Sequence, residues 1–129
     1  MSPQDQLKAI LERHCASLVG ETTAAGAKFA ESVLVPALYE ELAREATEIV
    51  HRINGSSGSL GFHSLSLAAS KFEDALKESI LLGAAPDEAN IRRMHGLFKE
   101  MQKIAEQTRP QESKLYNLDP AQIEQSSQT

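Results

Sequence analysis

One histidine, His51, stands in a predicted helix and is followed one turn later by unusually small residues. A neutral imidazole is a nucleophile near pH 7, so it can carry a phosphoryl group or a proton. Gly55 comes four residues after it, and the run continues with Ser56, Ser57 and Gly58. A glycine inside a helix costs about 1 kcal/mol relative to alanine. The spacing therefore indicates that another group must come close to His51.

Apolar residues around His51 recur at steps of three and four, which is one face of an α-helix. This predicted face consists of Leu38, Leu42, Ala46, Ile49, Ile53, Ser57 and Leu60. His51 is two residues from both Ile49 and Ile53, so it projects about 200° away from them. The sequence predicts an exposed histidine.

These residues carry a resemblance to a known family. The segment 51–57, the pair Leu60-Gly61, Leu65 and the pair Phe72-Glu73 keep their register without gaps. Together they resemble the signature of histidine-containing phosphotransfer (HPt) domains. The family usually has lysine three residues after the histidine, where this chain has Asn54.

The resemblance implies a phosphorelay protein in which His51 is the phosphoacceptor. It would take a phosphoryl group from the aspartyl phosphate of one response-regulator receiver domain and pass it to another. A hybrid histidine kinase is the expected upstream partner. The chain needs no cofactor of its own, because Mg²⁺ is expected on the receiver. Nothing in the sequence resembles an ATP-binding kinase domain, so self-phosphorylation is not expected.

The same resemblance suggests supporting roles for neighbouring side chains. Glu73 occupies the family position that often approaches the ring; alternatively, it is a surface glutamate paired with Lys77 at i+4. Asn54 could donate a hydrogen bond to the phosphoryl group but brings no charge. Either Arg52 or Lys71 could supply that charge, and either could equally be a solvated surface cation.

Other chemistry is not supported. The serines after His51 have no acid–histidine pair at a recognisable spacing, so a hydrolase triad is not predicted. The glycine- and serine-rich run lacks the Gly-Lys-Ser/Thr ending of a phosphate-cradling loop. With one cysteine and scattered histidines, no metal site is predicted. His14 falls on an apolar stripe and is expected to be a partly buried core residue.

The bulk composition limits the class of protein. A chain of 129 residues with a net charge of −5 is acidic, unlike most nucleic-acid binders. The lone Cys15 favours a reducing compartment, and no apolar run approaches the ~20 residues that span a membrane. The expectation is a stand-alone cytoplasmic monomer that binds neither nucleic acid nor membrane.

Apolar periodicity predicts helices over about 3–35, 36–60, 64–82 and 87–107, with Ser64 and Asp87 as N-caps. Gly20 and Gly26 leave open a break in the first helix near 20–23. The predicted fold is all-α: an antiparallel four-helix bundle over 1–108 with a polar C-terminal tail over 109–129, partly docked or flexible.

A second functional hypothesis belongs to another class. A helical adaptor that binds a signalling partner without carrying phosphate would also fit a relative that has lost the charge at Asn54. Phosphorylation of His51 separates the two hypotheses.

Overall fold

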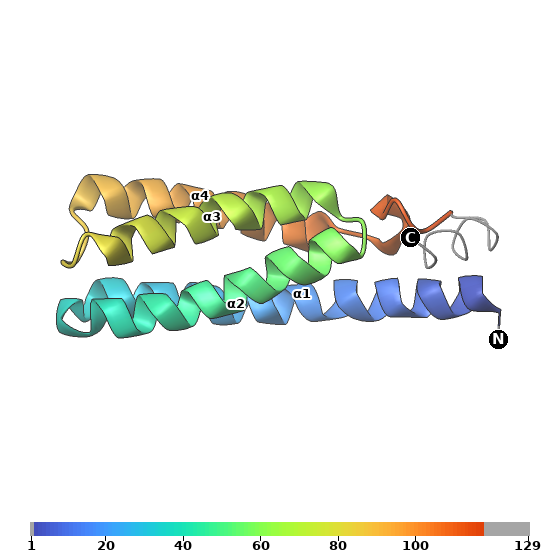
Figure 1. Cartoon of the computed structure of the whole chain (residues 1–129), viewed down its shortest axis with the longest axis horizontal. Helices are drawn as coiled ribbons and strands as arrows, with labels where there is room; N and C mark the ends of the chain where they lie inside the picture. The colour runs from blue at the N-terminus through green and yellow to red at the C-terminus, as the bar shows by residue number, and fades with distance from the viewer. Residues whose placement is uncertain (1, 118–129) are drawn as a thin grey trace.

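The computed structural model describes residues 2–117 and contains four long helices in this range. These are α1 (Pro3–Leu34), α2 (Tyr39–Ser59), α3 (His63–Leu81) and α4 (Glu88–Gln107). Short 3-10 turns, η1 (Pro36–Leu38) and η2 (Pro110–Glu112), follow α1 and α4. Successive helices run up and down alongside one another (Figure 1). The predicted antiparallel four-helix bundle is confirmed.

Helix α1 is continuous and extends beyond the other helices at its N-terminal end (Figure 1). Ser2 caps it by accepting a hydrogen bond from the backbone N–H of Asp5 at 3.1 Å. The break that Gly20 and Gly26 left open does not occur. Gly26 is instead a point of close packing, because a Cβ there would lie 2.5 Å from the ring of Phe98 on α4.

An aromatic cluster joins three helices at the centre of the bundle. The ring centroid of Phe72 on α3 lies 5.5 Å from that of Phe29 on α1, in an edge-to-face arrangement. It lies 5.6 Å from the ring centroid of Phe98 on α4. Phe72 is fully buried. Aromatic pairs in these geometries stabilise a fold beyond their buried area alone. The helix that carries Glu73 is therefore anchored in the core by the residue just before it.

Helix α2 turns a slightly different face to the core from the one predicted. Its buried residues are Tyr39, Ala43, Ala46, Val50, Ile53 and Ser57. The prediction that Leu38 is buried is wrong: Leu38 ends the separate turn η1 and is 48% exposed. The centre of the buried face thus lies about 120° from His51 rather than opposite it. His51 therefore lies at the side of α2 and not directly opposite its buried face.

The α2–α3 turn depends on a glycine. Gly61 has φ 84°, a left-handed conformation that disfavours side chains. A Cβ there would also lie 3.0 Å from the backbone nitrogen of Lys114. Helix α3 begins at His63 after Phe62, so the predicted N-cap at Ser64 is wrong. The buried Phe62 ring fixes the start of the helix by packing rather than by a side-chain cap.

The segment after α4 packs back onto this turn. The backbone N–H of Lys114 donates to the carbonyl of Gly61 at 3.1 Å, and the hydroxyl of Ser113 donates to that of Leu60. Tyr116 packs against the core. The division at residue 108 stays a prediction, and the remainder of the tail, 118–129, lies outside the described residues.

Asp87 caps α4 as predicted, because its Oδ1 accepts from the backbone N–H of Asn90 at 2.8 Å. No helix within residues 2–117 has both the length and the apolar composition needed to cross a membrane.

Candidate functional site

His51 presents its imidazole to solvent on the α3 side of α2. Its side chain is 70% exposed, although Val50 just before it is fully buried. The backbone at this position is therefore anchored by the core while the ring stays accessible. A reacting group on another protein can reach such a ring without a cleft.

Glu73 on α3 contacts the ring from the inside. Its Oε2 lies 2.8 Å from Nδ1 of His51, and the Glu73 side chain is only 5% exposed. Burial by itself raises the pKa of Glu73, but hydrogen bonds from Lys77, Asn54 and His51 outweigh it and leave this pKa below its ordinary value. Glu73 is thus an ionised carboxylate, which can only accept.

An acceptor at Nδ1 decides where the protons of His51 lie. The Nδ1 atom must carry the proton that it donates to Glu73, so in the neutral ring the lone pair is on Nε2. Nε2 is the ring nitrogen on the side away from Glu73. The contact therefore selects the tautomer whose nucleophilic nitrogen is on the outside.

Asn54, one turn after His51, binds the other oxygen of the same carboxylate. Its Nδ2 donates to Oε1 of Glu73 at 3.3 Å. On the opposite side, its Oδ1 accepts from the hydroxyl of Ser66 on α3 at 2.6 Å. Asn54 therefore bridges Ser66 and Glu73 rather than pointing freely toward solvent.

Lys77 lies one turn after Glu73 and supplies a positive charge to the cluster. Its Nζ is 2.8 Å from Oε2 of Glu73, the oxygen that also accepts from His51. The hydrogen bond to Glu73 raises the pKa of Lys77. The two interpretations of Glu73 are thus compatible: it contacts both His51 and Lys77.

Gly55 faces open space beside the ring. It is exposed, and a Cβ placed on it would meet nothing within 4 Å. Nothing inside the bundle requires glycine there, which contrasts with the crowded Gly26 and Gly61. The free surface beside His51 is available to a partner.

The structure does not bring Arg52 and Lys71 into the cluster. Both side chains are exposed, and neither forms an ion pair or a hydrogen bond with any part of residues 2–117. The positive charge that contacts Glu73 comes from Lys77 instead. Sequence reasoning had considered Lys77 only as an ordinary helical partner of Glu73.

Ser66 was missed altogether. Its position offers a signal, because it lies seven residues before Glu73 and eleven before Lys77, which places all three on one face of α3. Their partners His51 and Asn54 are on α2, so the sequence of α3 alone does not reveal these contacts.

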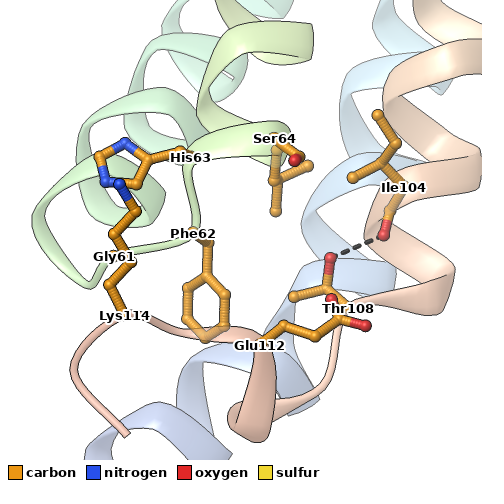
Figure 2. A pocket seen from close by; sticks show the side chains of 9 residues that line it. Gly61, Phe62, His63, Ser64, Ile104, Thr108, Glu112 and Lys114 are labelled. Atoms are coloured by element: carbon orange, nitrogen blue, oxygen red, sulfur yellow. Dashed lines mark hydrogen bonds between the residues drawn. The ribbon is translucent and has the colours of Figure 1, made fainter.

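Two hollows that α3 helps to line do not include His51. One, of about 170 Å³, lies at the end of the bundle between the α2–α3 turn and η2 (Figure 2). Thr108 bonds back to the carbonyl of Ile104 on its wall, so its hydroxyl is satisfied. The other is a groove between α2 and α3, lined by Arg44, Thr47, Glu48, Lys77, Ile80 and Leu81. Within the described residues, no group of three or more His, Cys, Asp or Glu side chains could hold a metal ion.

His14, which sequence analysis placed in the core, is buried as predicted. Its Nε2 lies 3.1 Å from the hydroxyl of Ser57 on α2, and its ring stacks on Phe62 at 5.4 Å. Burial lowers the pKa of His14, opposed in part by the negative charge of Glu21. Within the glycine-serine run, Ser57 is therefore buried in the core, whereas Gly55 faces outward.

Comparison with known proteins agrees with this geometry. The family model of the Hpt domain matches residues 6–110, which includes all four helices almost entirely. No curated protein and no solved structure gave a significant match. The matched region includes His51 and Glu73, which contacts its ring. The chain belongs to the Hpt domain family, the histidine-containing phosphotransfer domains.

Proposed function

We propose that His51 accepts a phosphoryl group from the aspartyl phosphate of one receiver domain and passes it to another. Membership of the Hpt domain family implies histidine phosphotransfer in phosphorelay signalling and contact with receiver domains. The observation that carries the assignment to His51 is its exposed ring, held through Nδ1 by the buried carboxylate of Glu73 at 2.8 Å.

The transfer step uses the lone pair of Nε2. It attacks phosphorus in line, forming an N–P bond, while the P–O bond to the receiver aspartate breaks and its electron pair leaves with the carboxylate. The Nδ1 proton stays on the ring. The ring thereby gains positive charge, which the carboxylate of Glu73 stabilises. Return of the phosphoryl group to a second receiver reverses the same bonds.

An open site suffices for this chemistry because the partner supplies the rest. Phosphoryl transfer depends mainly on in-line positioning and on neutralising charge. Mg²⁺ and the acidic pocket around it belong to the receiver in this proposal, and the chain contributes the nucleophile and its orientation. We place the protein in the cytoplasm as a monomer, with a hybrid histidine kinase upstream.

Asn54 gives the site a weaker electrostatic environment than a lysine would. Phosphorylation adds about −1.5 to −2 charges, and the neutral amide is already engaged by Ser66 and Glu73. Lys77 offsets the charge of Glu73 rather than that of a group on Nε2. The arrangement favours passing the phosphoryl group onward over storing it.

The proposal is tested by incubating the chain with a receiver domain phosphorylated on its aspartate. Label that moves to the chain and is acid-labile but base-stable supports phosphotransfer to histidine. Stable binding of receivers without any transfer of label would instead support the adaptor hypothesis. A His51→Gln variant serves as the control for the site, since it keeps a side chain that can donate to Glu73.

A further inference from the structure

The amide of Asn54 is oriented from both ends. Its Nδ2 faces Oε1 of Glu73 at 3.3 Å, and its Oδ1 faces the hydroxyl of Ser66 at 2.6 Å. An amide turned over would place its carbonyl oxygen against the carboxylate, where two acceptors repel. The Ser66 hydroxyl, which donates, favours the orientation in which Asn54 donates to Glu73.

The Ser66 hydroxyl is itself held in a confined place. It also lies 3.4 Å from the backbone carbonyl of Asn54, and a Cβ on Gly58 would approach its Oγ to 3.2 Å. Gly58 lies one turn after Asn54 on the same side of α2. The missing side chain at Gly58 therefore leaves the space in which Ser66 reaches Asn54.

We propose that Ser66 is a positioning residue for phosphotransfer, acting through Asn54 and Glu73 on the tautomer of His51. The proposal rests on the function proposed above. The connected contacts run from Ser66 on α3 to Asn54 on α2, back to Glu73 on α3, and from there to His51 on α2. This series of contacts thus crosses between the two helices three times.

This series of contacts gives Asn54 a role that a lysine at the same position could not fill in the same way. A lysine has only donors, so it cannot accept from Ser66. Asn54, which replaces the usual family lysine, therefore has a matching donor in the hydroxyl of Ser66 on α3. Asn54, which accepts from Ser66, binds one oxygen of Glu73 and leaves the other for His51 and Lys77.

The first test uses Ser66→Ala, with Ser64→Ala as the matched control. Ser64 is exposed on the same helix, and its side chain forms no hydrogen bond with the rest of residues 2–117. Loss of this half-buried hydrogen bond should slow transfer from a phospho-receiver about three- to tenfold. The imidazole ¹⁵N shifts of His51 should move from the Nδ1–H tautomer toward a mixture. Ser64→Ala should change neither quantity.

A double-mutant cycle distinguishes positioning from a general structural effect. In an Asn54→Ala background, Ser66→Ala should have no further effect on the transfer rate, because the two residues act through one contact. Gly58→Ala should shift the His51 tautomer in the same direction by crowding Ser66, whereas Gly55→Ala should not, because its Cβ would meet nothing.

Unchanged ¹⁵N shifts and an unchanged transfer rate in Ser66→Ala would overturn the proposal, as would fully additive effects in the cycle. Because the ¹⁵N shifts are measured on the unphosphorylated chain, they report on the contacts even if the wild-type protein accepts no phosphate. A wild-type chain that fails to take label would instead refute the proposed function.

Discussion

Nδ1 of His51 on α2 and Oε2 of Glu73 on α3 lie 2.8 Å apart, across the contact between the two helices. One partner is 70% exposed and the other 5% exposed. The imidazole therefore has one nitrogen engaged by the protein and the other turned toward solvent. This division between the two nitrogens is the basis of the proposed mechanism.

Replacing Glu73 by glutamine should destabilise the fold at neutral pH by about 1 kcal/mol, since buried hydrogen bonds to charged groups are lost. The pKa of Glu73 is lowered on folding, so its contribution is complete above the ordinary value of 4.5 and is lost as the pH falls through the lower folded value. Urea unfolding of both proteins at pH 7 and pH 3 measures the difference. An equal difference in the free energy of unfolding between the two proteins at both pH values would contradict this prediction.

Protonation of His14 should weaken the fold in mild acid. The folded-state pKa of His14 lies below its ordinary 6.5, so the unfolded chain binds a proton more readily. Its stabilising contribution is therefore complete above pH 6.5 and declines as the pH falls toward the folded value. The melting temperature of His14→Gln should depend less on pH between 7.5 and 5 than that of the wild type.

The exposed His63 provides a control for this measurement, because it lies at the start of α3 and outside the His14–Ser57 contact. His63→Gln should retain the wild-type pH dependence. Equal slopes for the wild type and His14→Gln would show that His14 does not govern acid sensitivity.

Gly55→Leu should slow phosphotransfer sharply without unfolding the protein. The new side chain meets no atom of the bundle but occupies the surface beside His51 that a receiver must approach. Gly20→Leu is the matched control: Gly20 is also exposed and helical with nothing within 4 Å, and it lies on α1. Unimpaired transfer by a folded Gly55→Leu variant would remove the steric argument.

Asn54→Lys should raise the equilibrium fraction of phosphorylated protein against a given phospho-receiver. A cation one turn from His51 offsets charge on the phosphoryl group, and at an exposed site this corresponds to about a two- to fivefold shift. The gain should shrink as salt rises. An equilibrium that does not move at low salt would show that Lys77 or the partner already provides the charge.

The fold was predictable because its signals are local. Steps of three and four gave all four helices, and Asp87 followed by Asn90 three residues later behaved as a cap. The errors came from tertiary packing. Leu38 looks like part of the α2 stripe, but Pro36 opens a separate turn that rotates it outward. Ser64 looks like a cap, but the buried Phe62 takes the N-cap position two residues earlier, and α3 begins at His63.

The sequence predicts several residues of the candidate site but not the contacts between helices that connect them. His51 and Gly55 follow from spacing on one helix, and Asn54 and Glu73 from the resemblance. The contact between Ser66 and Asn54 depends on how two helices face each other, which periodicity does not specify. For the same reason the sequence offers Arg52 and Lys71 either as sources of positive charge or as solvated surface cations, whereas the cation beside Glu73 is Lys77.

The most direct test of the mechanism is the position of the phosphoryl group within the imidazole. The chain, phosphorylated by a phospho-receiver, is examined by ³¹P–¹H correlation NMR, and the modified residue is mapped by mass spectrometry. The expected result is a single phosphohistidine at residue 51 with phosphorus on Nε2, because Nδ1 is engaged by Glu73. Phosphorus on Nδ1, or on another residue, would contradict it.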